Sequence, residues 1–130
     1  MNIKKTPNDL VNELQLQWVR SFNARDIEGL VSLYSREACL FGGKPELSFA
    51  LSGVRAYFSA LPPFGLRAEF GENTVVKLSA TVINSAGFVT FARAEPTSSE
   101  IPVRYRLTLT LLEEDGIWKI ACHHASPVPK

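Results

Sequence analysis

The stretch that decides the fold is VRYRLTLTLLEEDGIWKIACHHAS, residues 103–126. In its first half, arginines and threonines alternate with Tyr105 and leucines, so unlike side chains fall on the two sides of an extended chain. This period of two is typical of a β-strand with one wet face and one apolar face. Asp115 and Gly116 come next and predict a hairpin turn, because this pair accepts positive φ at low cost. A second strand is therefore expected after the turn, over residues 117–125.

The region before this hairpin shows the same period. Strands are expected over residues 66–70, 74–83 and 87–95, with a turn at Asn84 and Ser85 between the last two. A shorter strand is expected further upstream, over residues 37–41. These strands and the closing hairpin together predict a meandering sheet.

Helices are expected before the strands. Thr6 is a suitable cap for the first, and apolar residues then recur every four positions at Leu10, Leu14, Trp18 and Phe22.

Two shorter helices complete the helical region. Asp26 is a suitable cap for the second helix, and a third begins at Ser52 or Gly53 and ends before Pro62. Helices followed by strands indicate an α+β fold. We expect the N-terminal helices to pack on one face of a strongly curved antiparallel sheet, with a conical ligand pocket between the sheet and the long helix.

Size and composition are those of one ordinary globular domain, spanning residues 1–130. A net charge of +1 gives no attraction to nucleic acid or to an anionic membrane, and no apolar run has the length of a membrane span. The N-terminus lacks the apolar core of a signal peptide, so we expect a cytoplasmic protein with reduced thiols. Cys39 and Cys122 are expected to be small buried apolar residues, although a disulfide is open to them if their strands are neighbours.

Three segments resemble a known superfamily. They are the Trp18 helix with the following residues 23–42, the third helix at 53–58, and the ending DGIWKIACHHASPVP, residues 115–129. All three are similar to the nuclear transport factor 2-like, SnoaL-like (polyketide-cyclase-like) proteins. The resemblance covers nearly the whole chain and implies a cystatin-like α+β cone.

Within that superfamily the ending most resembles the association domain of calcium/calmodulin-dependent protein kinase II and its small bacterial relatives. The shared pattern is D-G-x-W-x-I-x-x-x-H-x-S-x-x-P, in which His124 is the histidine. The resemblance implies ring assembly and an arginine-lined cavity, with Arg93 at one expected arginine position and Arg104 in a P-x-R-Y segment typical of bacterial relatives. Ala125 departs from the pattern, because the kinase domain has an arginine beside its terminal histidine.

The only two histidines are neighbours, His123 and His124. Adjacent strand residues point to opposite faces unless a bulge intervenes, so one pocket is not expected to hold both. His124 shares a strand face with Trp118 and Ile120, so it is the candidate pocket residue. An imidazole titrates near neutral pH, so His124 is also the candidate catalytic acid or base. His123 is expected to point elsewhere. A hydrogen-bonded structural role stays open for either ring. Neither a metal nor a cofactor is expected.

An arginine and several aromatic residues are the other candidates for the pocket. Arg93 shares a strand face with Phe91, so it needs an internal partner, such as Glu95, or an anionic ligand. The expected ligand-binding residues are Arg93, His124, Arg104, Trp18, Tyr57 and Phe91. No clear set of buried carboxylates is visible that could serve as a base.

Three functions stay open on this basis. The first is a homodimeric cone domain that binds a small, anionic ligand. The second is a cyclase- or isomerase-type enzyme that uses a pocket histidine as acid or base, and the third is an oligomerisation module. The expected partners are a small molecule and further copies of the chain.

Overall fold

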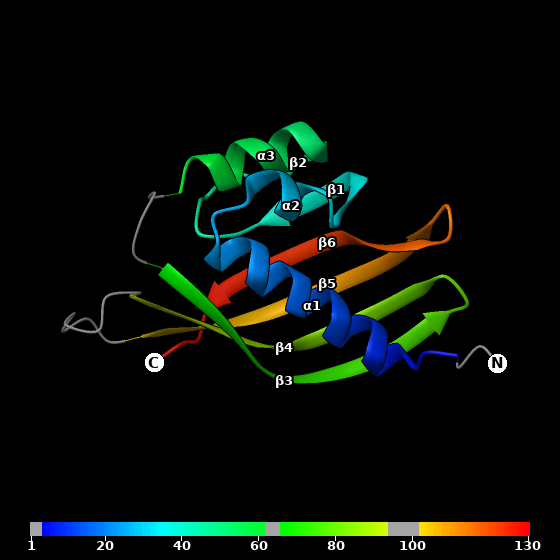
Figure 1. Cartoon of the computed structure of the whole chain (residues 1–130). Coiled ribbons are helices and arrows are strands. Elements are labelled where there is room, and N and C mark those ends of the chain that lie inside the picture. The colour runs from blue at the N-terminus through cyan, green and yellow to red at the C-terminus, as the bar shows by residue number, and fades with distance from the viewer. Residues whose placement is uncertain (1–3, 62–65, 94–101) are drawn as a thin grey trace.

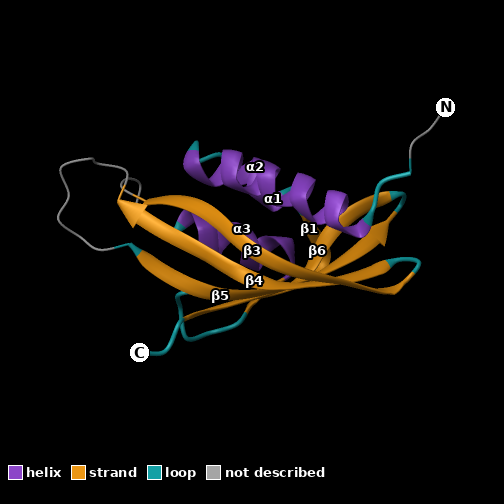
Figure 2. Ribbon diagram, turned by 90° about the horizontal axis from the view of Figure 1, so that it is seen from below, coloured by secondary structure: helices purple, strands orange, loops and turns teal. Residues whose placement is uncertain are grey.

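A long helix crosses a twisted sheet in the computed structural model, which describes residues 4–61, 66–93 and 102–130, with Arg93 as backbone alone (Figure 1). The elements in chain order are α1 (Pro7–Asn23), α2 (Ile27–Val31), β1 (Tyr34–Phe41), β2 (Ser48–Phe49), α3 (Ala50–Ser59), β3 (Leu66–Ser79), β4 (Val82–Arg93), β5 (Val103–Glu114) and β6 (Ile117–Pro127). The helices lie on one face of the sheet (Figure 2), and α1 contacts β3 while α3 contacts β1. The predicted α+β cone is therefore confirmed.

Helix α1 begins and is oriented as the sequence predicts. The Thr6 side chain accepts a hydrogen bond from the Asp9 backbone N–H, and the Asp9 carboxylate accepts one from the Thr6 N–H, which together form a capping box. The face that α1 buries against the sheet includes Leu14, Trp18 and Phe22. This face places the indole of Trp18 at the centre of the space between helix and sheet.

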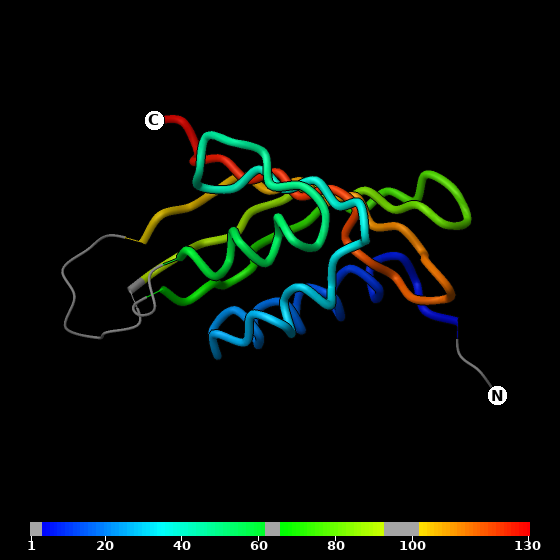
Figure 3. The backbone as a smooth tube through the Cα atoms, turned by 90° about the horizontal axis from the view of Figure 1, so that it is seen from above, coloured from blue at the N-terminus to red at the C-terminus, as the bar shows by residue number. Residues whose placement is uncertain are grey.

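The sheet is mixed, and this corrects the expectation of a wholly antiparallel one. Its strand order is β2-β1-β6-β5-β4-β3. The last strand, β6, inserts between β5 and β1 and runs parallel to β1, whereas the other neighbours are antiparallel. Viewed from above, the first strand and the last lie side by side, although residues 42–116 separate them in the chain (Figure 3).

The turn between β3 and β4 lies four residues earlier than predicted, at Ala80 and Thr81. Asn84 and Ser85 suit a turn by residue type, but both lie inside β4. The Ser85 side chain is buried and donates to the Asn73 side chain on β3. Pairing with β3, through the bond to Asn73, thus outweighs the preference of Asn84 and Ser85 for a turn.

A bulge in β6 decides which side chains face the helices. Leu111 of β5 pairs with Ile120, but Thr110 pairs with Cys122, so Ala121 is an extra residue on β6. Before the bulge, Ile120 faces the core, and after it the alternation is reversed. His123 is consequently buried and His124 exposed.

Candidate functional site: an aromatic pocket between helices and sheet

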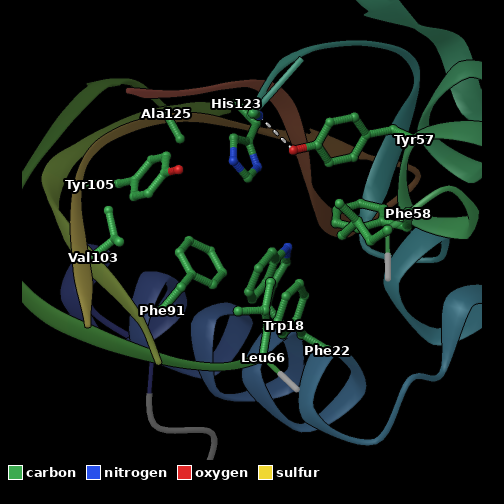
Figure 4. A pocket seen from close by; sticks show the side chains of 13 residues that line it. Trp18, Phe22, Tyr57, Phe58, Leu66, Phe91, Val103, Tyr105, His123 and Ala125 are labelled. Atoms are coloured by element: carbon green, nitrogen blue, oxygen red, sulfur yellow. Dashed lines mark hydrogen bonds between the residues drawn. The ribbon is translucent and has the colours of Figure 1, made fainter. Parts of the chain in front are cut away.

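A cavity of about 210 Å³ lies between the sheet and the helices, at the end where β6 finishes (Figure 4). Its walls come from α1, α3, the loop after β1, and the strands β3 to β6. The lining residues are Trp18, Phe22, Gly42, Gly43, Tyr57, Phe58, Leu61, Leu66, Phe91, Val103, Tyr105, His123 and Ala125.

Stacked and edge-on rings form one wall of the cavity. Trp18 stacks on Phe22 with ring centroids 4.8 Å apart, and it meets Phe58 edge-on at 6.1 Å and Phe91 at 6.4 Å. Phe91 in turn meets Tyr105 edge-on at 5.5 Å. Such offset and edge-to-face contacts hold each ring in place, so the wall is rigid before any ligand arrives.

A hydrogen-bonded chain crosses the core behind this wall. The Trp18 indole N–H donates to the Tyr34 hydroxyl at 3.0 Å, and the Tyr34 oxygen lies 2.9 Å from Nδ1 of His123. The three side chains come from α1, β1 and β6 and are all buried. The chain therefore fixes the His123 ring from behind, while the ring itself projects into the cavity (Figure 4).

The donors in this chain favour one tautomer of His123. The indole nitrogen of Trp18 can only donate, so the Tyr34 oxygen accepts from it. Because Nδ1 of His123 lies within reach of the Tyr34 hydroxyl hydrogen, we assign Nδ1 as the acceptor of that hydrogen. Burial, and secondarily the neighbouring His124, lower the pKa of His123 to about 3, so the ring is neutral near pH 7. A neutral ring that accepts at Nδ1 carries its hydrogen on Nε2. His123 is thus a neutral hydrogen-bond donor.

Tyr57 forms the opposite side of the cavity. Its hydroxyl accepts a hydrogen bond from the Gly43 backbone N–H at 2.8 Å, and burial raises its pKa. The loop can approach this closely only because residue 42 is glycine: a Cβ there would lie 2.0 Å from the Tyr57 oxygen. Tyr57 therefore brings a neutral hydroxyl to the pocket, held by the loop after β1.

Three of the predicted ligand-binding residues line this pocket: Trp18, Tyr57 and Phe91. Two others do not. His124 lies on the outer face, where its ring is 5.3 Å from that of Phe41, and the Arg104 guanidinium stacks 3.7 Å from the centre of the Phe88 ring, also outside. The inward orientation expected for His124 is wrong, whereas Arg104 lies on the wet face that the alternation of its strand predicts and is not among the described lining residues.

The sixth predicted residue, Arg93, ends β4 opposite Leu66, which lines the pocket. Its side chain lies outside the described part of the chain, as does Glu95, its candidate partner.

Sequence reasoning missed Tyr34 and exchanged the histidines. Tyr34 begins β1 and links Trp18 to His123, and it is not among the residues predicted for the site. His123 was expected to point away from the pocket. The sequence carries no signal for this exchange, because the extra residue on β6 that reverses the alternation shows only in the pairing of β5 with β6.

The described pocket residues supply hydrogen bonds but no formal charge, since they include neither a carboxylate nor a lysine or arginine. Among the residues that the structure describes, no three histidine, cysteine or acidic side chains lie close enough to hold a metal ion. None of the described helices is both long and apolar enough to span a membrane.

The chain matches the model of the SnoaL-like domain over residues 11–130, and it belongs to that family. A comparison with the curated proteins finds no match.

Solved structures share the fold at low sequence identity. A candidate calcium/calmodulin-dependent protein kinase II association domain from Xanthomonas campestris is 21% identical with a TM-score of 0.83, over 100% of this chain and 96% of that one. A Nostoc punctiforme protein of unknown function with a cystatin-like fold is 16% identical, with a TM-score of 0.80 over 98% and 97%. A hexachlorocyclohexane dehydrochlorinase from Novosphingobium barchaimii is 14% identical, with a TM-score of 0.79 over 94% and 86%. These similarities confirm the cystatin-like α+β cone as the fold.

Proposed function

We propose that the chain binds a small, uncharged, mainly apolar organic molecule with one hydrogen-bond acceptor. The observation that carries the proposal is the neutral His123 ring, held from behind by Tyr34 and facing a cavity with aromatic walls. A carbonyl oxygen directed at Nε2 would accept its hydrogen. The rest of the ligand would lie against Trp18, Tyr57 and Phe91, the wall residues expected from the sequence.

The size of the cavity limits the ligand. An apolar cavity of roughly 150 Å³ binds benzene, and drug-sized ligands occupy about 300–1,000 Å³. The cavity of about 210 Å³ therefore fits a single ring with a few substituent atoms. It is too small for a fused multi-ring molecule unless its walls move.

An uncharged ligand replaces the anionic one expected from the sequence. The anionic ligand depended on Arg93 and His124 as partners. His124 faces outward, and the described lining offers no cation, because His123 binds a proton only near pH 3. An anion placed in this apolar cavity without a paired charge would lose its hydration without compensation.

Catalysis is the second candidate, and the same histidine favours it. A neutral imidazole that donates a hydrogen bond can polarise a carbonyl and stabilise the negative charge that develops on its oxygen. The low pKa makes His123 a weak base, so it does not take the acid–base role expected of a pocket histidine. A reaction would also need a proton acceptor, and the described lining contains no carboxylate. Binding is therefore the better supported function.

A homodimer formed through the sheet is proposed as its assembly. The outer face of β4 and β5 carries small uncharged side chains at its centre, where Ala86 pairs with Thr108 and Asn84 with Thr110. A face of small uncharged side chains can pack closely on a second copy without burying unpaired charge. Light scattering on Thr108→Glu should then give a monomer. A ring in the wild-type protein would instead support the oligomerisation module.

The binding proposal is tested with two probes of similar shape, acetophenone and ethylbenzene, only the first of which has a carbonyl. Both should raise the melting temperature of the wild-type protein, acetophenone more. Ala125→Leu should abolish both shifts, because it fills the cavity, whereas Ala56→Leu on the exposed side of α3 should not. His123→Phe should remove the preference for acetophenone, with His124→Phe as the matched control.

Two results would overturn the proposal. One is binding of acetophenone that Ala125→Leu leaves intact. The other is a stronger shift with benzoate, lost in Arg93→Ala, which would restore the anionic ligand.

A further inference from the structure

The two cysteines of the chain are direct neighbours on the outer face of the sheet. Cys39 of β1 pairs in register with Cys122 of β6. Side chains of paired residues in adjacent strands point to the same face, and here the flanking Leu40 and His123 point inward. The two thiols therefore meet on the side away from the pocket.

The spacing of the strands brings these thiols within range of a covalent bond. Neighbouring strands lie about 4.8 Å apart, and disulfides join Cα atoms that are about 4.4–6.8 Å apart. Both cysteines are free thiols, Cys122 exposed and Cys39 half-buried. Burial, and secondarily the adjacent Cys39, raise the pKa of Cys122, which agrees with two sulfur atoms in close proximity.

We propose that Cys39 and Cys122 form a reversible redox site that hydrogen peroxide converts to a disulfide across the β1–β6 junction. The exposed Cys122 thiolate attacks peroxide; the O–O bond breaks, one oxygen stays on sulfur as a sulfenic acid, and the other leaves as water after protonation. The Cys39 sulfur then attacks the Cys122 sulfur, the S–O bond breaks, and a second water leaves as the S–S bond forms. Overall, two thiols lose two electrons and peroxide gains them.

The position of the bond gives it a mechanical effect. The junction of β1 with β6 is interrupted, since Tyr34 pairs with Ile120 and the regular register resumes only at Cys39. A disulfide at the point where pairing resumes would close a long loop of chain and stabilise the oxidised protein. It would also restrain the segment of β6 that carries His123. The redox proposal does not depend on the binding proposal.

Exposure and thiol acidity set the expected rates. An exposed cross-strand disulfide is accessible to thiols such as dithiothreitol and should be reduced quickly. Because the pKa of Cys122 is raised, little thiolate is present near pH 7. The rate of oxidation should therefore increase with pH up to and beyond pH 9.

The experiment is intact-mass spectrometry after treatment with hydrogen peroxide. The wild-type chain should lose about 2 Da, both thiols should resist alkylation, and peptide mapping should find Cys39 linked to Cys122 in the monomer. The melting temperature of the oxidised protein should rise by about 5 °C and return after dithiothreitol. Cys39→Ser and Cys122→Ser should each abolish the loss of 2 Da.

Three outcomes would overturn the proposal. Wild-type Cys122 could proceed to sulfinic acid while Cys39 stays open to alkylation, which would show that the two sulfurs do not meet. The disulfide could instead form between two chains. The wild-type protein could also retain both free thiols at peroxide concentrations that fully oxidise an unfolded control of the same sequence.

Discussion

The Tyr34 hydroxyl and Nδ1 of His123 lie 2.9 Å apart in the core, although 89 positions separate the two residues. The hydroxyl also accepts from the Trp18 indole, so one oxygen joins the long helix, the first strand and the last. This contact fixes both the orientation and the tautomer of the only imidazole among the described pocket residues.

The stability of the protein should depend on pH through His123. The native ring binds a proton only near pH 3, whereas the unfolded ring does so near pH 6.5. Between these values the unfolded state holds more protons, so the free energy of unfolding falls as pH falls, by up to about 1.4 kcal/mol per pH unit. Urea denaturation over this range should show a shallower pH slope for His123→Gln than for the wild-type protein. The outer-face variant His124→Gln should keep the wild-type slope; equal slopes for all three would contradict the assignment.

Removing the central hydroxyl should be costly. Tyr34→Phe leaves the Trp18 N–H and the His123 Nδ1 buried without their partner, and each orphaned group costs about 1–3 kcal/mol. Chemical denaturation should detect the loss. ¹⁵N NMR of the imidazole should also show a change in the ratio of the two tautomers, which a purely steric defect would not cause.

The sequence predicts those parts of the fold that local residue types determine. The Thr6 cap, the apolar face around Trp18 and the turn at Asp115 and Gly116 are all confirmed, the turn with φ values of 50° and 80°. Each follows from chemistry within a few residues. The parallel pairing of β1 with β6 does not, because no local pattern states which strand a closing strand will join.

The sequence predicts the aromatic walls of the candidate site but not its polar centre. Trp18, Tyr57 and Phe91 line the cavity, because large apolar residues on the inner faces of the helices and strands are buried between them. The choice between His123 and His124 depends on Ala121, an extra residue with no distinctive side chain. A bulge at such a residue is visible only when both strands are paired.

The loop beside Tyr57 should tolerate a methyl group at one glycine but not at the next. A Cβ at Gly42 would lie 2.0 Å from the Tyr57 oxygen, whereas one at Gly43 would lie at an ordinary 3.8 Å. Gly42→Ala should therefore displace the Tyr57 ring and weaken acetophenone binding at least tenfold, about 1.4 kcal/mol. Isothermal calorimetry should find Gly43→Ala close to wild type. Equal binding by both variants would show that Tyr57 does not shape the cavity.

A pair of amides, of which Gln15 is buried and Asn73 half-buried, should hold α1 to β3. The Gln15 amide donates to the Asn73 side-chain oxygen at 3.2 Å, and the Asn73 amide donates to Gln15 at 2.9 Å. Gln15→Leu removes both of these hydrogen bonds, although the Asn73 amide still donates to the Gly71 carbonyl, and should lower the free energy of unfolding by about 1 kcal/mol. Gln17→Leu, on the exposed side of the same helix, should change it by less than about 0.5 kcal/mol. Thermal denaturation of the two variants gives the comparison.

The extra residue in β6 decides which of two sets of side chains on this strand faces the cavity and which faces outward. Deleting Ala121 would make the pairs of Leu111 with Ile120 and of Thr110 with Cys122 regular, so His123 and Ala125 would stay inward. Pairing Ala121 with Thr110 instead would shift the rest of β6 by one residue, which would send His123 and Ala125 outward and bring Cys122 and His124 inward. The bulge thus holds the neutral imidazole in the cavity, and a one-residue slip would replace it with a thiol and a different imidazole without any change of sequence.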